Sequence, residues 1–323
     1  MQTRKYLNNH FATISIFISS LFFSPLHAAD LFPEDVFITL KDSGELAQYA
    51  GQTIWKGDPI MLYNSITPDG KRLVVSSPKM KSVYVFDTTS HMRLAKVKVG
   101  KASKGLKVSP NGKEVYVANE GESSVSVVDL ASYKVVATIK TEEMPHNIRF
   151  SDDGKQAYVT LQGGAGLGVI DTKLRKVTKV IPIPGIIGPH NLDISKDGRI
   201  VFIRDTAGSV AVLDLKSGEV KKVITVGKGH AGIDVSTDGK LVFTGAIADD
   251  IITVIDANTY NVIKNVKVGF GPHGVRTSKD GRWLYVVVTA DNKMVVINTK
   301  TLEVAKTFDV ADFPFWVAVN GNP

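Results

Sequence analysis

One turn dipeptide recurs along the chain at an almost constant interval, and this interval restricts the fold more than any other feature. Asp-Gly or Asn-Gly occurs seven times, with successive spacings of 42, 42, 44, 41, 42 and 40 residues. The first residues of these dipeptides are Asp69, Asn111, Asp153, Asp197, Asp238, Asp280 and Asn320. Each turn is followed by three short runs rich in Val, Ile and Tyr, such as "KEVYVANE", "SSVSVVDL" and "KVVATIKT". Runs of this kind, bounded by Asp, Asn or Gly, are typical of β-strands.

With the strand that precedes its turn, each unit is predicted to hold four antiparallel strands. Four-stranded units of about 40–45 residues are the signature of a β-propeller blade. Six complete units run from about Asp58 to Ala311, and the seventh is divided between the chain ends. Residues 314–319 have the pattern of an innermost strand, and residues 34–57 have the pattern of the other three. We therefore predict an all-β, seven-bladed propeller, closed by N- and C-terminal strands that share one blade and leave no open edge.

The first 28 residues are typical of a cleavable export signal. Arg4 and Lys5 precede an apolar run, residues 11–23, that is too short for a comfortable membrane span, and "SPLHAAD" supplies small residues for cleavage. We expect a signal peptide over residues 1–28, a single propeller domain over residues 29–323, and a periplasmic location in a Gram-negative cell. The chain has no cysteine, which excludes a lipoprotein anchor, disulfides, thiolate metal sites and covalent c-type haem attachment.

The basic balance of the chain does not by itself indicate a nucleic-acid partner. The formal net charge is +7, and the lysines are scattered along the segments rather than clustered. Scattered lysines favour a solvated basic surface over a nucleic-acid interface. We expect no nucleic acid and no membrane anchor, a monomer, and at most a periplasmic protein partner.

The segment "VYVANEGESSVSVVDLASYKVVATI" resembles the YVTN-repeat propellers, and the resemblance extends over essentially the whole chain after the signal. That superfamily includes the haem-d1 domain of nitrite reductase, proteins related to it in haem-d1 assembly, and periplasmic metal chaperones. The resemblance implies the fold, but it does not select one function, because blades serve many functions.

Four of the seven histidines enter the innermost strand of four successive units. They lie in "MPHNIRF", "GPHNLDI", "GKGHAGIDV" and "GPHGVRT", and they are His146, His190, His230 and His273. The equivalent positions of all units are Leu62, Lys104, His146, His190, Ala231, His273 and Phe315, with His230 displaced by one residue. The repeat therefore predicts that four imidazoles gather at one rim of the central channel.

A ring of mostly charged residues follows three positions further along the same strands. Its members are Ser65, Lys107, Arg149, Asp193, Asp234, Arg276 and Ala318. The residues just before them are mostly apolar, so strand alternation predicts that the charged ring faces the channel. We expect Arg149 to pair with Asp193 and Arg276 to pair with Asp234, as ion pairs that line a wet channel.

The histidine rim is the candidate binding site, because imidazoles favour Zn, Cu or haem iron. The predicted metal ligands are the four histidines together with Glu120 and Asp205. For a haem-type tetrapyrrole, Arg149, Arg204 and Arg276 would hold carboxylate groups, and Tyr63 and Trp316 would flank the channel mouth. Unperturbed imidazoles would let protons compete with the metal between about pH 7.5 and 5.5.

Three other interpretations stay open at this stage. The histidines could only tie down loop backbone through hydrogen bonds. The same face could serve a propeller-type hydrolase or lyase through a metal-bound water, although no GxSxG motif, Walker loop or cysteine nucleophile is present, which favours a protein that is not an enzyme. The propeller could also be a protein-interaction scaffold without a small ligand.

Overall fold

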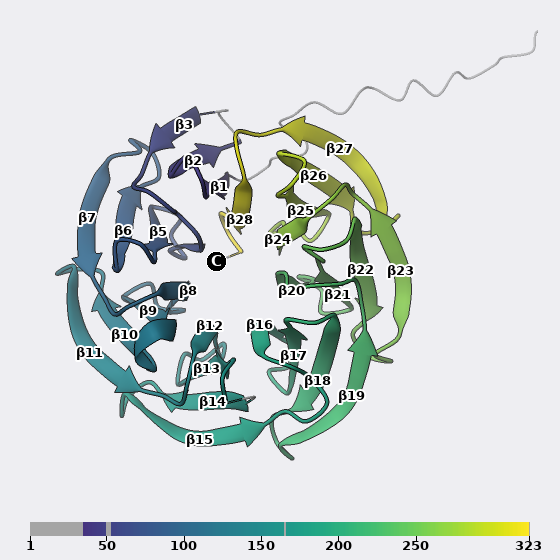
Figure 1. Cartoon of the computed structure of the whole chain (residues 1–323), viewed down its shortest axis with the longest axis horizontal. Helices are drawn as coiled ribbons and strands as arrows, with labels where there is room; N and C mark the ends of the chain where they lie inside the picture. Colours follow the sequence, from purple (N-terminus) through teal and green to yellow (C-terminus); the bar gives the residue numbers. More distant parts are fainter. Residues whose placement is uncertain (1–34, 50–52, 165, 323) are drawn as a thin grey trace, which may run out of the picture.

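Seven four-stranded antiparallel sheets form a ring around a central channel (Figure 1). This computed structural model describes residues 35–49, 53–164 and 166–322. The predicted signal peptide, residues 1–28, lies outside the described residues. Within those ranges, no helix is long and apolar enough to cross a membrane.

The first three blades follow the predicted units in order. Blade 1 contains β4 (Asn64–Ile66), β5 (Arg72–Ser77), β6 (Ser82–Asp87) and β7 (Arg93–Lys98). Blade 2 contains β8 (Ser103–Val108), β9 (Glu114–Asn119), β10 (Ser124–Asp129) and β11 (Lys134–Lys140), with a 3-10 turn, η1 (Glu120–Glu122), after β9. Blade 3 contains β12 (Pro145–Phe150), β13 (Gln156–Leu161), β14 (Gly166–Asp171) and β15 (Lys176–Pro182).

The remaining blades complete the ring. Blade 4 contains β16 (Pro189–Ile194), β17 (Ile200–Asp205), β18 (Ser209–Asp214) and β19 (Glu219–Thr225). Blade 5 contains β20 (Ile233–Val235), β21 (Leu241–Thr244), β22 (Ile251–Asp256) and β23 (Val262–Lys267). Blade 6 contains β24 (Pro272–Thr277), β25 (Trp283–Val288), β26 (Lys293–Asn298) and β27 (Glu303–Asp309). Blade 7 joins β28 (Pro314–Val319) to β1 (Val36–Leu40), β2 (Glu45–Gln48) and β3 (Thr53–Lys56).

The recurring turns owe their shape to two residue types. Gly70 has a φ of 73°, a left-handed conformation that glycine adopts without steric cost. The Asp69 carboxylate accepts hydrogen bonds from the Thr67 hydroxyl at 2.6 Å and from the Lys71 backbone N–H at 3.1 Å. Short polar side chains that bond nearby backbone in this way are the usual turn formers. The same chemistry repeats in the later blades, so the dipeptides mark one face of the ring.

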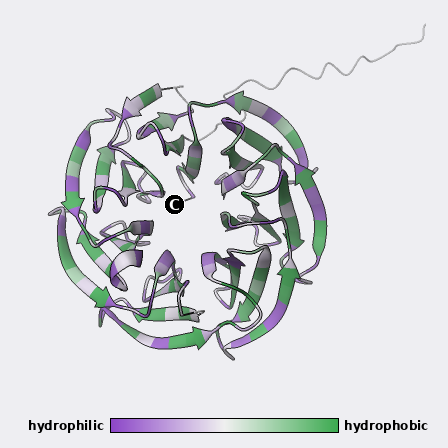
Figure 2. Ribbon diagram, in the orientation of Figure 1, coloured by the Kyte–Doolittle hydropathy of each residue, from purple (hydrophilic) through white to green (hydrophobic). Residues whose placement is uncertain are grey.

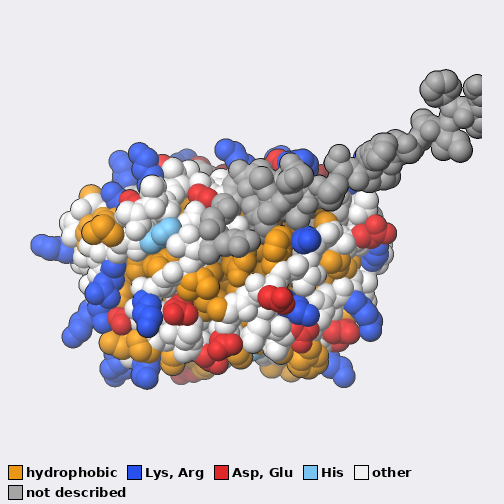
Figure 3. Space-filling model, turned by 90° about the horizontal axis from the view of Figure 1, so that it is seen from above, with side chains coloured by type: hydrophobic (Ala, Val, Ile, Leu, Met, Phe, Trp, Pro, Cys, Tyr) orange, Lys and Arg blue, Asp and Glu red, His pale blue; other side chains and the backbone are white. Residues whose placement is uncertain are grey.

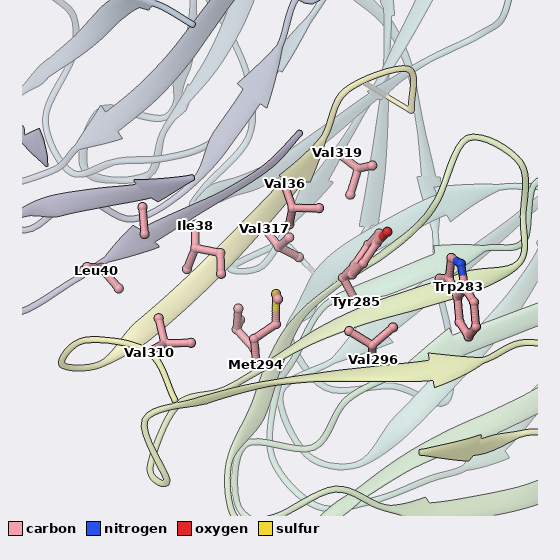
Figure 4. Packing of buried hydrophobic residues seen from close by; sticks show 12 residues of the cluster. Val36, Ile38, Leu40, Trp283, Tyr285, Met294, Val296, Val310, Val317 and Val319 are labelled. Atoms are coloured by element: carbon pink, nitrogen blue, oxygen red, sulfur yellow. The ribbon is translucent and has the colours of Figure 1, made fainter. Parts of the chain in front are cut away.

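Apolar packing between neighbouring blades supplies the core. The middle strands are largely hydrophobic, whereas the outer strands alternate hydrophobic and hydrophilic residues (Figure 2). Between blades 6 and 7, Met294 and Val296 pack against Ile38 and Val317 (Figure 4). All four side chains are at most 1% exposed, so each contact removes apolar surface from water.

The outer edge of the ring is charged with both signs. Figure 3 shows Lys and Arg side chains dispersed among Asp and Glu over one edge of the disc, with hydrophobic side chains between them. Exposed ion pairs such as Lys221 with Glu219 on β19 add little stability, because solvent screens them. The edge keeps the protein hydrated and does not hold the fold together.

Pairing of β28 with β1 closes the ring, as the sequence predicted. The two strands are antiparallel, with Val36 opposite Val319 and Ile38 opposite Val317. The blade formed from both chain ends therefore has the same four-strand order as the other six. The predicted bounds, residues 314–319 with residues 34–57, agree with the observed strands.

Deletion of residues 312–323 should prevent formation of a stable ring. The deletion removes β28 and with it Val317 and Val319, which are buried between blades 6 and 7. Circular dichroism melting and size-exclusion chromatography should show loss of the cooperative transition or aggregation. Removal of only residues 321–323 leaves β28 intact and should lower the melting temperature by a few degrees at most. A deletion of residues 312–323 that melts like the full chain would contradict the closure.

Candidate functional site

The four predicted histidines form one continuous cluster at the rim of the channel. The ring centroids of His146 and His190 lie 3.7 Å apart, those of His190 and His230 lie 4.5 Å apart, and those of His230 and His273 lie 5.2 Å apart. His146, His190 and His273 are buried, and His230 is partly exposed. The repeat thus brings four imidazoles from four successive blades into contact. We call these four residues the histidine cluster.

A break in strand pairing explains how the histidines and the charged ring can both face the channel. Residues three apart on a regular strand point to opposite faces. In β12 the pairing with β13 shifts between Pro145 and Ile148, so His146 and Asn147 lie in a bulge and Arg149 returns to the regular ladder. A bulge inserts the extra residue that restores a common face. Similar shifts occur in β8, β16 and β24.

His146 uses both ring nitrogens in hydrogen bonds. Its Nδ1–H donates to the Glu120 carboxylate at 3.1 Å, and its Nε2 accepts from the Tyr63 hydroxyl at 2.9 Å. Lys104 Nζ lies 3.5 Å from the other oxygen of Glu120. A carboxylate that fixes the tautomer and orientation of an imidazole is typical of the surroundings of metal ligands. Here it holds His146 at one end of the cluster.

His190 and His273 each keep a buried nitrogen without a protein partner. The His273 Nδ1–H donates to the Phe315 carbonyl at 2.8 Å, which leaves its Nε2 as an acceptor with no partner. His190 Nδ1 is likewise buried with no partner among the described residues. Unsatisfied buried polar atoms are costly, so native structures hold few of them. These two nitrogens are among seven such buried side-chain atoms in the described residues, and they are the two that belong to the histidine cluster.

The cluster is neutral near pH 7. Burial lowers the pKa of His230 to about 4 and that of His273 to about 3. Burial, followed by the neighbouring histidines, lowers the pKa of His190 well below its usual value. Burial also lowers the pKa of His146, although the hydrogen bond and charge of Glu120 act in the opposite direction. The range of proton competition predicted from the sequence, pH 7.5 to 5.5, therefore moves to lower pH.

Glu120 is ionised beside this neutral cluster. Burial acts to raise its pKa, but the hydrogen bond with His146 and the charge of Lys104 lower it overall. Since His146 is neutral at pH 7, the cation that balances Glu120 is Lys104. The sequence placed Lys104 in the ring but did not identify it as part of the site.

The structure does not bring Asp205 to the histidine cluster as a metal ligand. Its Oδ1 accepts backbone N–H groups of Ala207, Gly208 and Ser209 at 2.7–3.0 Å, and its Oδ2 accepts the Ile187 N–H at 3.3 Å. A carboxylate with both oxygens committed to backbone donors organises a loop. In the described residues, no group of three or more His, Asp or Glu side chains is arranged to hold a metal ion.

Arg204 also serves the loops rather than a cofactor. It is fully buried, and its guanidinium donates to the carbonyls of Gly227, Gly229 and Ser209. Burial lowers its pKa to about 10, so it stays charged at neutral pH. The three carbonyls account for its placement between blades 4 and 5.

Arg149 and Arg276 line the cavities at the turn-face end of the channel, and no histidine is part of those linings as described. Tyr63 and Trp316, with centroids 4.6 Å apart, belong to a buried cluster that also contains Leu62 and Phe315. Tyr63 contacts His146, and Trp316 contacts His273, so these two aromatic residues flank the cluster as predicted. The residues predicted for a tetrapyrrole are therefore divided between the two ends of the channel.

The predicted ion pairs are present in the channel. Arg149 Nε donates to Asp193 at 3.2 Å, and Arg276 Nη1 donates to Asp234 at 2.7 Å. A cavity of about 420 Å³ is lined by these four residues and by turn residues that include Ser151. This cavity opens on the face of the Asp-Gly turns, whereas the sequence placed the ligand site at the histidine face alone.

A belt of asparagines escaped the sequence analysis. The side chain of Asn147 donates to that of Asn191, and Asn191 donates to the Ala231 carbonyl at 2.7 Å. This belt links blades 3, 4 and 5 directly behind His146 and His190. The repeated "PHN" in blades 3 and 4 was the available signal.

The comparisons with known proteins agree on the fold. The sequence model described as a YNCE-like beta-propeller matches residues 58–282. No curated protein sequence is similar enough to count as a match. Many solved structures are similar to this chain, and the three compared below are each less than 25% identical to it.

Hydrazine synthase of Kuenenia stuttgartiensis is 21% identical with a TM-score of 0.72, over 79% of this chain and 88% of that one. A functionally unknown protein of Desulfotomaculum acetoxidans is 13% identical with a TM-score of 0.74, over 90% and 100% of the two chains. Dihydro-heme d1 dehydrogenase NirN, solved in complex with DHE, is 19% identical with a TM-score of 0.66, over 90% and 76%. At these identities the likeness shows the propeller fold alone.

Stability should fall as the pH decreases below about 6.5, because the folded protein holds its histidines neutral. An imidazole in the unfolded chain titrates near pH 6.5, so between that value and the folded pKa of about 3 for His273 the unfolded chain binds more protons. Lowering the pH from 7 to 5 should cost about 2 kcal/mol through this residue alone. Melting temperatures of the wild-type protein and His273→Asn between pH 7 and 5 measure the effect.

Between pH 7 and 5, the melting temperature of His273→Asn should fall by about 5 °C less than that of the wild type. Asparagine can keep the donor to the Phe315 carbonyl without a titrating ring. His91 lies outside the cluster, stacked on Trp55, so His91→Asn is the control and should retain the wild-type pH dependence. Equal pH dependence in wild type and His273→Asn would contradict the assignment.

Proposed function

The chain belongs to the YNCE-like β-propeller family, and on this scaffold we propose an exported, non-enzymatic binding protein whose histidine cluster holds a metal ion. The observation that carries the proposal is the pair of buried imidazole nitrogens without protein partners, His190 Nδ1 and His273 Nε2. Both belong to neutral rings in contact with His230. Neutral imidazole nitrogens are the donors that Zn and Cu prefer.

Each histidine would have a distinct part in this site. Two neighbouring members of the set His190, His230 and His273 would supply donor nitrogens to one ion, while His146 is held by Glu120 and Tyr63 through both of its own nitrogens. The described side chains do not surround a common point three at a time, so we propose that the ion's remaining ligands come from solvent or from a molecule delivered with it. A bound ion of this class would act as a Lewis acid or as cargo.

A haem-type cofactor is the less favoured candidate. The likeness to NirN in complex with DHE and to hydrazine synthase motivates it, but that likeness concerns the fold. Arg149 and Arg276, which would have to hold carboxylate groups, line the cavities at the turn-face end of the channel, whose described linings contain no histidine. No specific observation in the described residues favours the hydrolase, lyase or scaffold alternatives over metal binding.

Metal binding should depend on the histidine cluster. After treatment with a chelator, the protein should bind Zn²⁺ or Cu⁺ in calorimetric or competition titrations. His230→Ala should weaken this binding by at least about tenfold, because loss of a ligand costs at least as much as loss of its supporting partner. The His230 side chain makes no hydrogen bond to the described residues, and its partial exposure makes the variant tolerable for folding.

The control for this prediction is His91→Ala, which removes a histidine paired with Gln48 outside the cluster and should leave affinity unchanged. Haem added to the wild-type protein should give no saturable change in the visible spectrum. A protein that binds neither metal, or whose His230→Ala variant binds as tightly as wild type, would refute the metal proposal. A saturable haem spectrum would support the cofactor alternative instead.

Export can be tested independently of ligand binding. If residues 1–28 are a signal peptide, the protein expressed in a Gram-negative cell should appear in the periplasmic fraction with Ala29 as its first residue. Mass spectrometry of the fractionated protein measures this directly. An unprocessed chain retained in the cytoplasm would contradict the proposed location.

A further inference from the structure

The end of the channel opposite the histidine cluster holds a second constellation of polar groups. The innermost strands of five successive blades, 2 to 6, each contribute one charged side chain to the cavity of about 420 Å³: Lys107, Arg149, Asp193, Asp234 and Arg276. We call these five residues the channel charges. They come from the innermost strands, whose backbone is fixed by pairing on one side and by neighbouring blades on the other.

The two carboxylates are already saturated. Asp193 accepts from Arg149 Nε at 3.2 Å with one oxygen and from the Val235 backbone N–H at 2.8 Å with the other. Asp234 accepts from Arg276 at 2.7 Å with one oxygen, and from the backbone N–H and hydroxyl of Thr277 at 2.7 and 2.8 Å with the other. These oxygens have partners from the protein and do not call for a bound cation.

The two arginines are not saturated. A guanidinium carries five N–H donors. Arg149 donates through Nε to Asp193 and through Nη1 to the Ile148 carbonyl, and Arg276 donates through Nη1 to Asp234. Within the described residues, Nη2 of Arg149 and both Nε and Nη2 of Arg276 have no hydrogen-bond partner. Yet these side chains are only 5% and 6% exposed. Nearly buried donors that line a cavity can be satisfied by a ligand.

A smaller hollow shows where the positive charges converge. It has a volume of about 10 Å³ and is lined by Tyr63 and Trp316 and by three basic side chains, Lys107, Arg149 and Arg276. Its described lining contains no carboxylate. The same three basic side chains also line the larger cavity. They therefore form its floor, and the small hollow adds room for about one atom the size of a water oxygen.

The electrostatics of this floor favour an added negative charge. Burial, followed by the charges of Arg149 and Arg276, lowers the pKa of Lys107 well below its usual value, although Asp193 and Asp234 act in the opposite direction. Burial and then the charge of Arg276 also lower the pKa of Arg149. An anion placed among these groups would offset the repulsion between them.

We propose that the turn-face end of the channel binds a small oxyanion, the carboxylate or phosphate group of a compound that fits the cavity. The anionic group would lie on Lys107, Arg149 and Arg276, and the rest of the compound would extend toward the turns, where Ser151 and Thr237 line the opening. Guanidinium groups suit this role because their planar forks match the oxygens of both anions. The site is independent of the histidine cluster and of any metal bound there.

Proton uptake should accompany anion binding. Lys107 faces Arg149, Asp193, Asp234 and Arg276 across the channel, with Lys196 and Asp152 further out along the lining. An anion beside its amine favours the protonated form, so the complex should take up protons at any pH where the free amine is partly neutral. The two aspartates keep their hydrogen bonds to arginine and backbone throughout.

Calorimetry of the purified protein with inorganic phosphate and, separately, with succinate tests this proposal. At least one probe should bind saturably, and its heat should change between buffers of different ionisation enthalpy, which reports proton uptake. Lys107→Met should weaken binding by at least about tenfold, because it removes a charge-assisted hydrogen bond. Folding should survive, since replacing a buried charge by an apolar chain of similar length is well tolerated. Lys107→Arg should restore binding without proton uptake.

The matched control is Lys71→Met, which removes a lysine on the same face, beside the Asp69-Gly70 turn and outside the cavity lining. It should bind both probes like wild type. Binding of phosphate only assigns the site to phosphate groups, and binding of succinate only assigns it to carboxylates. Failure of both probes to bind more tightly than about 10 mM, or equal affinity of Lys107→Met and wild type, overturns the proposal. His230→Ala should leave anion binding unchanged, so the two sites can fail separately.

Discussion

The pairing of β28 with β1 is the constraint on which the rest of the structure depends. Each innermost strand can face the channel only if the ring is complete, because an open arc would leave a sheet face and an apolar blade interface in water. The closing strand also carries Phe315 and Trp316, which contact His273. The strand that closes the ring therefore also provides the aromatic residues that contact the histidine cluster.

The channel has two chemically different ends, and Tyr63 and Trp316 lie against groups of both. At one end, neutral imidazoles lie in contact with each other and with Tyr63 and Trp316, where low polarity disfavours a charged ring. At the other end, Arg149 and Arg276 pair with carboxylates on neighbouring blades. Buried charges survive only when they are paired in this way. The same propeller thus keeps neutral imidazole donors at one end of the channel and charged side chains at the other.

The fold could be predicted from the sequence because the same spacing of turns and strands recurs in all seven units. It also predicted the contact among the histidines and the pairs Arg149–Asp193 and Arg276–Asp234, since equivalent positions in a ring are neighbours. It could not predict which oxygen meets which donor. Asp205 was expected to bind metal, but its carboxylate accepts hydrogen bonds from nearby backbone, such as the N–H group three residues further along the chain. Which donor a side chain meets depends on the conformation of its loop, and the repeat spacing carries no information about loop conformation.

Loop fastening and ligand binding are not exclusive roles for a histidine. An imidazole has two nitrogens, and fastening occupies only one of them. His273 fastens β28 through Nδ1 and retains Nε2, whereas His146 commits both nitrogens to Glu120 and Tyr63. A purely structural cluster would gain stability from pairing the remaining nitrogens as well, because each unsatisfied buried group costs about 1–3 kcal/mol. That His190 and His273 both leave one unpaired is the feature that fastening alone does not explain.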